Sequence, residues 1–406
     1  MSASLKEKGS AHLNKLCRSI GSRRVGSPAN RAAADYFRDT VEGFGFDTST
    51  PNFDCLDWCQ GGSSLTVEDR IQFNVQTSPY SLGCYTEGPV SVVSTIDELE
   101  TVDARDKILL VRGELGKEQL MPKNFTFYNP EEHRRIVGLL EAKRPLGIVA
   151  ATSRNPEVAG SISPFPLIED GDFDIPSVYI GEEEGVRLAR HAGQVGSLKI
   201  HALRSPAVAY NVIATSGDGK QCRIVIFAHV DTKDNTPGAL DNASGIVVLL
   251  LLAELLSNYS GSPGVELVAL NGEDYYSNPG QQQYLEMNKD GFDEILLGIN
   301  LDGVGYLEGA TAYSLYEPTA SISDLVESSL GSQRGLVKGE KWYQGDHGLF
   351  LNRGVPALAF TSEEVEELVE SIVHTPKDKP SVVEVDKLVE VATGLRKLIE
   401  DLRKLI

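Results

Sequence analysis

The sequence lacks a long hydrophobic run. Its longest apolar stretch, Ile246–Leu256, has 11 residues and includes Glu254. A helix that crosses a bilayer needs about 20 apolar residues, so this stretch predicts a buried core helix and no membrane partner. The opening residues MSASLKEKGSAHLNKL also lack the apolar core of a secretory signal peptide, so we do not expect secretion by that route.

Cysteine is scarce, with five residues spread over 406. An odd number of distant cysteines does not suit a disulfide framework and favours a reducing, cytoplasmic location.

Basic residues are also few: 38 Lys and Arg stand against 58 Asp and Glu, which gives a net charge of -20. Nucleic-acid binding needs a concentrated basic surface, so we expect no nucleic-acid partner.

The length favours one large domain and a smaller one. After about Pro206 apolar strands alternate with helices, which predicts an α/β domain with a mostly parallel sheet between helices. The middle of the chain has short strands and loops instead. We therefore expect a catalytic domain from residues 1–75 and 205–406, with a smaller β-rich domain inserted at 76–204.

Carboxylates and imidazoles follow the apolar strands of the second half. The segment CRIVIFA runs into a His-Val-Asp sequence, GVELVAL into Asn-Gly-Glu-Asp, and EILLGI into Asn-Leu-Asp. Since functional groups of open α/β sheets gather beyond the carboxyl ends of the strands, we expect these side chains to meet. The residues concerned, with one more Asp and one more His from loops, are His229, Asp231, Asp241, Glu273, Asp274, Asp302 and His374.

Each of these residues has a simple structural explanation when it is taken alone. Asp241 comes just before the apolar helix, and we expect it at the N-terminal cap. A carboxylate after a strand is usually a turn residue, and a His in a loop is usually solvated. Two His and three Asp on one edge, however, are the ligands that two divalent metal ions require.

The sequence resembles the co-catalytic zinc exopeptidases, which include bacterial leucine aminopeptidases and glutamate carboxypeptidase II. The resemblance covers nearly the whole chain and rests on motifs that occur in the family's order. They are an H-x-D motif at 229–231, G-x-x-D-N-x-S-G at 238–245, an acidic pair at 273–274, N-x-D at 300–302, D-H-x-x-F at 346–350 and H-T-P-x-D at 374–378. It implies the family's fold, a mixed and mostly parallel sheet covered by helices.

The resemblance also implies a metal centre with two divalent ions, which we expect to be zinc. Asp241 would bridge the two ions. His229 and Asp302 would complete one site, and Asp274 and His374 would complete the other.

Two further residues receive roles from the resemblance. Glu273 would be the general base that takes a proton from a water bridging the metals and passes it to the leaving amine. Asp231 would orient His229. The implied activity is the removal of residues from the ends of peptides.

The sequence departs from the family pattern at two positions. Asp274 stands where the family usually has Glu, so its backbone must approach the metal more closely. Val373 stands where several members have a Tyr that stabilises the oxyanion. Tyr343 or His347 could take over that role, although either could equally be a packed aromatic or a hydrogen-bonded loop residue.

Several functions remain open. A rim rich in Asp and Glu favours an aminopeptidase that acts on short peptides, because it suits a protonated amino terminus. A carboxypeptidase would need an arginine for the substrate carboxylate, for which Arg334 and Arg353 are available. A single-zinc acyltransferase like glutaminyl cyclase and a non-enzymatic binding protein share this fold.

The middle region is similar to a protease-associated domain, which would restrict the cleft to short peptides. The oligomeric state is not indicated.

Overall fold

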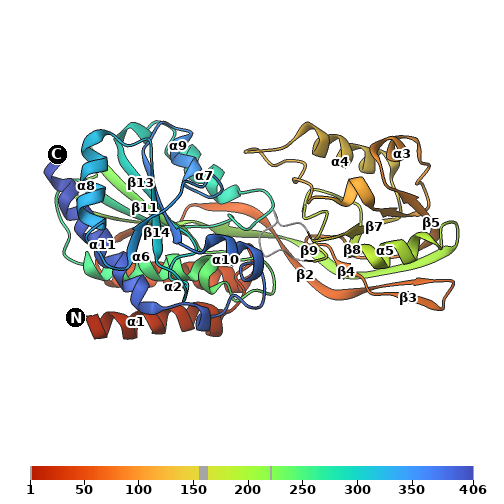
Figure 1. Cartoon of the computed structure of the whole chain (residues 1–406), viewed down its shortest axis with the longest axis horizontal. Coiled ribbons are helices and arrows are strands. Elements are labelled where there is room, and N and C mark those ends of the chain that lie inside the picture. Colours follow the sequence, from red (N-terminus) through yellow and green to blue (C-terminus); the bar gives the residue numbers. More distant parts are fainter. Residues whose placement is uncertain (1, 155–162, 220–221, 406) are drawn as a thin grey trace. The chain divides into compact units, whose positions relative to one another are not determined.

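The computed structural model describes residues 2–154, 163–219 and 222–405 (Figure 1). The chain forms two compact units, one from the residues up to Cys55 and from Val208 onward, the other from Leu56–Ala207. The expected boundary after residue 75 is therefore wrong. Residues 56–75 belong to the inserted unit because they form β2 (Asn52–Val67) and β3 (Ile71–Phe73), which lie in its sheet.

The first unit is built from the following elements. Its helices are α1 (Ser2–Asn14), α2 (Pro28–Gly43), α6 (Ser244–Leu255), α7 (Pro279–Met287), α8 (Ala320–Leu330), α9 (Gly348–Leu351), α10 (Val365–Ser371) and α11 (Val385–Leu402). Its strands are β1 (Asp47–Ser49), β10 (Val212–Ser216), β11 (Arg223–His229), β12 (Gly264–Leu270), β13 (Ile295–Leu301), β14 (Thr311–Tyr316), β15 (Leu336–Lys338) and β16 (Ala357–Ser362).

These strands form one mixed sheet in the order β1-β10-β12-β11-β13-β16-β14-β15. The four central strands, β12, β11, β13 and β16, are parallel to their neighbours within that group. Antiparallel pairing begins where β10 meets β12 and where β14 meets β16. The predicted α/β class with a mostly parallel sheet is confirmed.

Helices cover both faces of this sheet. On one face α6 packs against β11 and α11, and α11 also contacts α1 and α8. Ten successive residues of α6, Ser244 to Ala253, are buried. The hydrophobic run of the sequence is thus a core helix, and within the described residues no helix is long and apolar enough to cross a membrane. Alternate side chains of β11, Val225 and Phe227, point to the other face and join Tyr284 of α7 and Phe350 of α9 in one cluster.

The second unit has its own sheet, in the order β3-β2-β9-β5-β6-β7-β8-β4. Parallel pairing joins β5 to β6, β6 to β7 and β7 to β8, and the apolar strands of the middle region thus lie side by side. Its other elements are β4 (Gln76–Thr77), β5 (Cys84–Val93), α3 (Ile96–Thr101), β6 (Ile108–Val111), α4 (Glu131–Lys143), β7 (Gly147–Thr152), β8 (Ser177–Gly181), α5 (Glu182–Ala189) and β9 (Val195–Tyr210).

Phe350 lies in the hydrophobic core between the first sheet and the helices α7 and α9. Its ring is 1% exposed and stacks on Phe227 with 4.8 Å between the ring centroids. We expect Phe350→Ala to lower the free energy of unfolding of this unit by about 3–5 kcal/mol, because it leaves a cavity in the core. Met287 of α7 is 53% exposed, and its replacement by Ala should change that free energy by less than about 0.5 kcal/mol. Denaturant titration of both variants measures the difference, and equal losses would contradict this packing.

Candidate metal centre

Three neighbouring strands bring candidate ligands to one edge of the sheet. His229 is the last residue of β11, and Asp302 follows the end of β13. Asp274 lies in the loop that follows β12. Because β11 lies between β12 and β13 and is parallel to both, the three carboxyl ends share one edge, as the sequence predicts.

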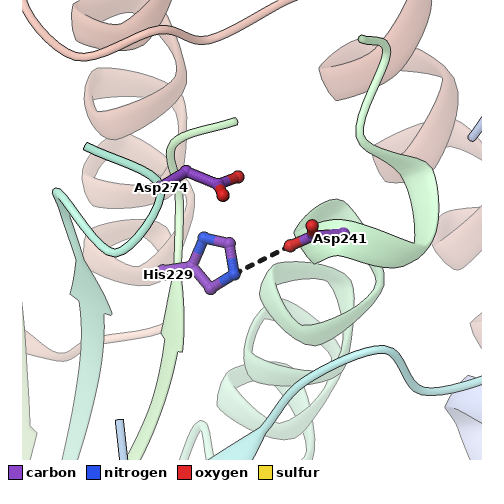
Figure 2. A group of neighbouring side chains, drawn as sticks. All are labelled: His229, Asp241 and Asp274. Carbon is purple, nitrogen blue, oxygen red and sulfur yellow. Dashed lines mark ion pairs between the residues drawn. The ribbon is translucent and has the colours of Figure 1, made fainter. Parts of the chain in front are cut away.

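The carboxylate of Asp241 lies between two imidazoles. Its Oδ1 is 3.0 Å from Nε2 of His229, and its Oδ2 is 3.0 Å from Nε2 of His374. Figure 2 shows Asp241 with His229 and Asp274, whose ligand atoms all lie within 4.8 Å of one another. One carboxylate that presents each oxygen to a different imidazole has the arrangement of a bridge between two ions.

The two remaining aspartates lie on opposite sides of this bridge. Oδ1 of Asp302 is 3.8 Å from Nε2 of His229, whereas Oδ1 of Asp274 is 2.9 Å from Nε2 of His374. The shorter side chain of Asp274 thus reaches its imidazole. Its second oxygen, Oδ2, accepts a hydrogen bond of 3.1 Å from the backbone N–H of Lys233, which leaves Oδ1 free to act as a ligand.

Asp241 does not cap the helix that follows it, so that expectation is wrong. Asp241 lies in an irregular turn with φ −116° and ψ 90°, the Asp241–Asn242 peptide bond is cis, and α6 begins at Ser244. The side-chain acceptor near the start of the helix is Oδ1 of Asn242, which takes a hydrogen bond of 3.1 Å from the N–H of Gly245. Because Asn242 provides this acceptor, the carboxylate of Asp241 is left to face the imidazoles.

Asp231 lies beside His229 and also accepts hydrogen bonds from the acidic loop that follows β12. Its Oδ1 is 3.7 Å from Nδ1 of His229. The same carboxylate accepts hydrogen bonds from the backbone N–H groups of Gly272 at 2.8 Å, Glu273 at 3.3 Å and Asp274 at 3.0 Å. Asp231 thereby ties the end of β11 to the backbone that carries Glu273 and Asp274.

Glu273 lies among charged neighbours. Burial raises the pKa of its carboxyl well above the usual value, and Asp274 and Asp346 add to this effect, although His229 opposes it. The nearby Asp346 is buried as well, and burial raises its pKa to about 7. A raised pKa makes the carboxylate of Glu273 a stronger proton acceptor, which suits a general base.

The residues of this edge fit divalent metal ions. Nε2 of His229 is buried and has no hydrogen-bond partner among the described residues, despite its closeness to Asp241. Burial lowers the pKa of His229 and of His374, but the surrounding aspartates outweigh burial and raise both pKa values well above their usual range. Burial alone would raise the pKa of Asp241, but the two imidazoles hold it far below its usual value. The carboxylates thus favour positive charge at this edge, which suits the binding of divalent cations.

The two candidates for oxyanion stabilisation lie in a cluster of aromatic rings. His347 is fully buried, its Nε2 donates a hydrogen bond of 2.9 Å to the carbonyl oxygen of Trp342, and its ring packs against Tyr316. These contacts favour a structural role for His347. Tyr343 is 76% exposed and packs edge-on against Tyr316. Val373, which precedes His374, is buried, and its side chain has no hydroxyl that could stabilise an oxyanion.

Two residues that hold the metal-binding segment were not foreseen as functional. Asp378 accepts hydrogen bonds from the backbone N–H groups of Leu240 and Asp241, and Arg23 donates to the carbonyl oxygen of Val230, which follows His229. Asp378 belongs to the H-T-P-x-D motif, which is the one signal in the sequence that could have identified it. Arg23 has no comparable signal.

A group of imidazoles and carboxylates at the edge of an α/β sheet is typical of metal-dependent hydrolases. Residues 211–399 match the model of peptidase family M28. The match covers all five expected metal ligands, and the resemblance drawn from the motifs is confirmed.

Individual relatives agree with this assignment. The chain is 25% identical over 300 residues to the probable lipoprotein aminopeptidase LpqL of Mycobacterium tuberculosis, covering 72% of this chain and 57% of LpqL. It is 24% identical over 395 residues to the aminopeptidase YwaD of Bacillus subtilis, covering 93% of this chain and 80% of YwaD. The structure of BSAP, a zinc aminopeptidase from Bacillus subtilis, matches with a TM-score of 0.73 at 19% identity, over 98% of this chain and 95% of BSAP. The chain thus spans little more than half of LpqL but has the fold of BSAP along nearly its whole length.

Asp241 is the ligand on which both candidate metal positions depend. Since each of its oxygens faces a different imidazole, we expect Asp241→Ala to abolish binding of both ions, whereas Asp302→Ala should weaken only the one beside His229. Metal analysis after dialysis gives the stoichiometry. Asp293→Ala, at an exposed carboxylate of the same unit, is the control and should bind metal as the wild type does. An unchanged stoichiometry in Asp241→Ala would refute the bridge.

Proposed function

We propose that this protein is an aminopeptidase that uses two zinc ions to remove amino-terminal residues from short peptides. The observation that carries the proposal is the position of Asp241, with one carboxylate oxygen 3.0 Å from each of the imidazoles of His229 and His374. Asp302 and Asp274 complete the two ligand sets on either side. The family of residues 211–399 and the zinc named for BSAP support zinc as the metal.

The chain's own residues provide the proton transfers of the proposed reaction. Bound divalent ions would polarise the peptide carbonyl and make the attacking water more acidic. Glu273 lies among the ligands with its backbone held by Asp231, and it accepts the proton of that water and delivers it to the leaving amine. Asp231 orients the ring of His229 and keeps the loop of Glu273 beside it.

The positions of two arginines favour an aminopeptidase over a carboxypeptidase. The guanidinium of Arg353 lies over the ring of Phe292, which precedes β13, whereas Asp302 follows the other end of that strand. The length of β13 separates them by about 20 Å. Arg334 is exposed and precedes β15. Since β15 is the third strand from β13 in the sheet, the two strands lie roughly 14 Å apart. Both positions are too remote for a clamp on a substrate carboxylate at the metals.

The inserted unit supports a second, structural part of the proposal. We propose that Leu56–Ala207 is a domain of the protease-associated kind that limits the substrates to short peptides. Its parallel strands β5 to β8, with α4 and α5 between them in the chain, agree with the pattern on which this expectation rests.

Paired reporter substrates test the proposed activity. We expect the protein to hydrolyse an aminoacyl anilide with a free amino group, to lose this activity in a chelator and to regain it with Zn²⁺. The N-acetylated anilide should not be hydrolysed, because it lacks the charged amine that the acidic edge binds. Release of carboxyl-terminal residues from amino-blocked peptides would indicate a carboxypeptidase instead. One metal ion per chain together with cyclisation of amino-terminal Gln would indicate an acyltransferase like glutaminyl cyclase.

Glu273 is the proposed base, and its amide variant separates proton transfer from metal binding. We expect Glu273→Gln to bind the metals with unchanged stoichiometry and to lose about 10²–10⁴-fold in kcat, since the amide cannot accept the proton. Glu286→Gln, at a carboxylate of α7 that is exposed to solvent, is the control and should retain full activity. A kcat near that of the wild type in Glu273→Gln would remove it as the base.

A further inference from the structure

The segment that joins two ligands, His229 and Asp241, is held by a buried arginine from the start of the chain. Arg23 is 0% exposed. Its Nε donates a hydrogen bond of 2.9 Å to the carbonyl oxygen of Val230. Its Nη1 donates 2.9 Å to the carbonyl oxygen of Pro237, and its Nη2 donates 2.8 Å to that of Gly238. One guanidinium therefore fixes both ends of the connection between the two ligands.

A buried carboxylate from the end of the chain holds the same segment a few residues further on. Oδ1 of Asp378 accepts a hydrogen bond of 2.7 Å from the N–H of Leu240, and Oδ2 accepts one of 3.0 Å from the N–H of Asp241. The carbonyl oxygen of Asp378 also accepts the N–H of Ala239 at 3.4 Å. Since both carboxylate oxygens bind backbone, Asp378 fixes the main chain of Asp241 and does not compete with it for a metal.

The two anchors are complementary in charge. Arg23 binds carbonyl oxygens, Asp378 binds amide N–H groups, and the positive charge of Arg23 opposes the effect of burial on the pKa of Asp378. Asp241 needs such anchors because its turn is not helical and has no regular hydrogen-bonding ladder to hold it. Displacing the turn would take from both buried charges the backbone groups that they bind, so the two anchors resist its displacement.

We propose that Arg23 and Asp378 are positioning residues that together set the carboxylate of Asp241 between His229 and His374. The inference rests on the proposed function, because it concerns the affinity of the same metal centre. Arg23 and Asp378 bind the main chain around Asp241 and thereby keep each of its carboxylate oxygens 3.0 Å from the imidazole of His229 or His374.

The second unit offers matched controls for both anchors. Asp170 is a buried carboxylate that accepts backbone N–H groups of Lys123 and Asp172, each at 2.8 Å. Arg204 donates to the carbonyl oxygens of Tyr80 and Phe173. The variants Asp378→Asn and Asp170→Asn therefore remove the same kind of contact, as do Arg23→Lys and Arg204→Lys. Only Asp378 and Arg23, however, bind the main chain of the segment that joins His229 to Asp241.

Competition with a chelator measures metal affinity without reference to catalysis. We expect Asp378→Asn and Arg23→Lys to weaken Zn²⁺ binding by about 10–100-fold, as is typical when a partner of a ligand is lost, and both controls to bind as the wild type does. The visible spectrum of the Co²⁺-substituted protein should also change in the two anchor variants, because the coordination geometry relaxes. Peptidase assays should show a lower kcat with little change in KM.

The possible outcomes separate this inference from the proposed function. Wild-type affinity and an unaltered Co²⁺ spectrum in both anchor variants would overturn the positioning role, and so would equal weakening in the controls. If Asp378→Asn does not fold, Arg23→Lys, which keeps the positive charge, decides by the same readouts. A wild-type protein that binds no divalent ion would instead refute the proposed function and this inference with it.

Discussion

The placement of one buried carboxylate determines the rest of the candidate site. Asp241 presents its oxygens to imidazoles that come from β11 and from the loop after α10, so its position fixes how close the two halves of the metal centre lie. A carboxylate so buried needs compensation on both oxygens, from protons on the imidazoles or from cations. The parallel strands, the hydrogen bond that Asn242 accepts from Gly245 and the anchors on the main chain all contribute to that placement.

The same principle explains how Asp274 serves where the family usually has the longer Glu. Asp231 accepts the backbone N–H groups of residues 272–274, which draws the loop toward the end of β11. With the main chain held there, the shorter side chain still brings Oδ1 to 2.9 Å from His374. Main-chain hydrogen bonds thus compensate for one missing methylene, and the N–H of Lys233 holds Oδ2 so that Oδ1 faces the imidazole.

The sequence predicted the α/β class and the grouping of His229, Asp241, Asp274, Asp302 and His374 because both follow from local signals. Apolar strands that end in polar residues identify the edge of the sheet, and the family motifs identify the ligands among them. The boundary after residue 75 was wrong because the alternation in β2 does not reveal which sheet that strand joins. The cap at Asp241 was wrong because Asn242, an equally good acceptor, comes next.

Arg23 and Asp378 were beyond sequence reasoning for a different reason. Both bind main-chain atoms, and the partners of Arg23 in the metal-binding segment, Val230 and Gly238, lie more than two hundred residues away along the chain. A side chain can bind the backbone of any residue type, so the sequence of the partner segment gives no sign of such a contact. Asp346 was seen as part of a motif, but the burial that raises the pKa of its carboxyl, and the hydrogen bond that it accepts from Gln281 of α7, depend on tertiary packing.

The order of these groups along the chain has a consequence for biosynthesis. Arg23 is made first, the whole inserted unit follows, then the loop that Arg23 anchors, and Asp378 comes near the end. Since domains generally fold as units while synthesis proceeds, the inserted unit can be complete before a single ligand of the metal centre exists. A nascent chain that has reached the end of β16 but not His374 has every strand of the sheet but still lacks one imidazole of the metal centre. The metal centre can therefore close only after the synthesis of His374, long after the inserted unit has been made.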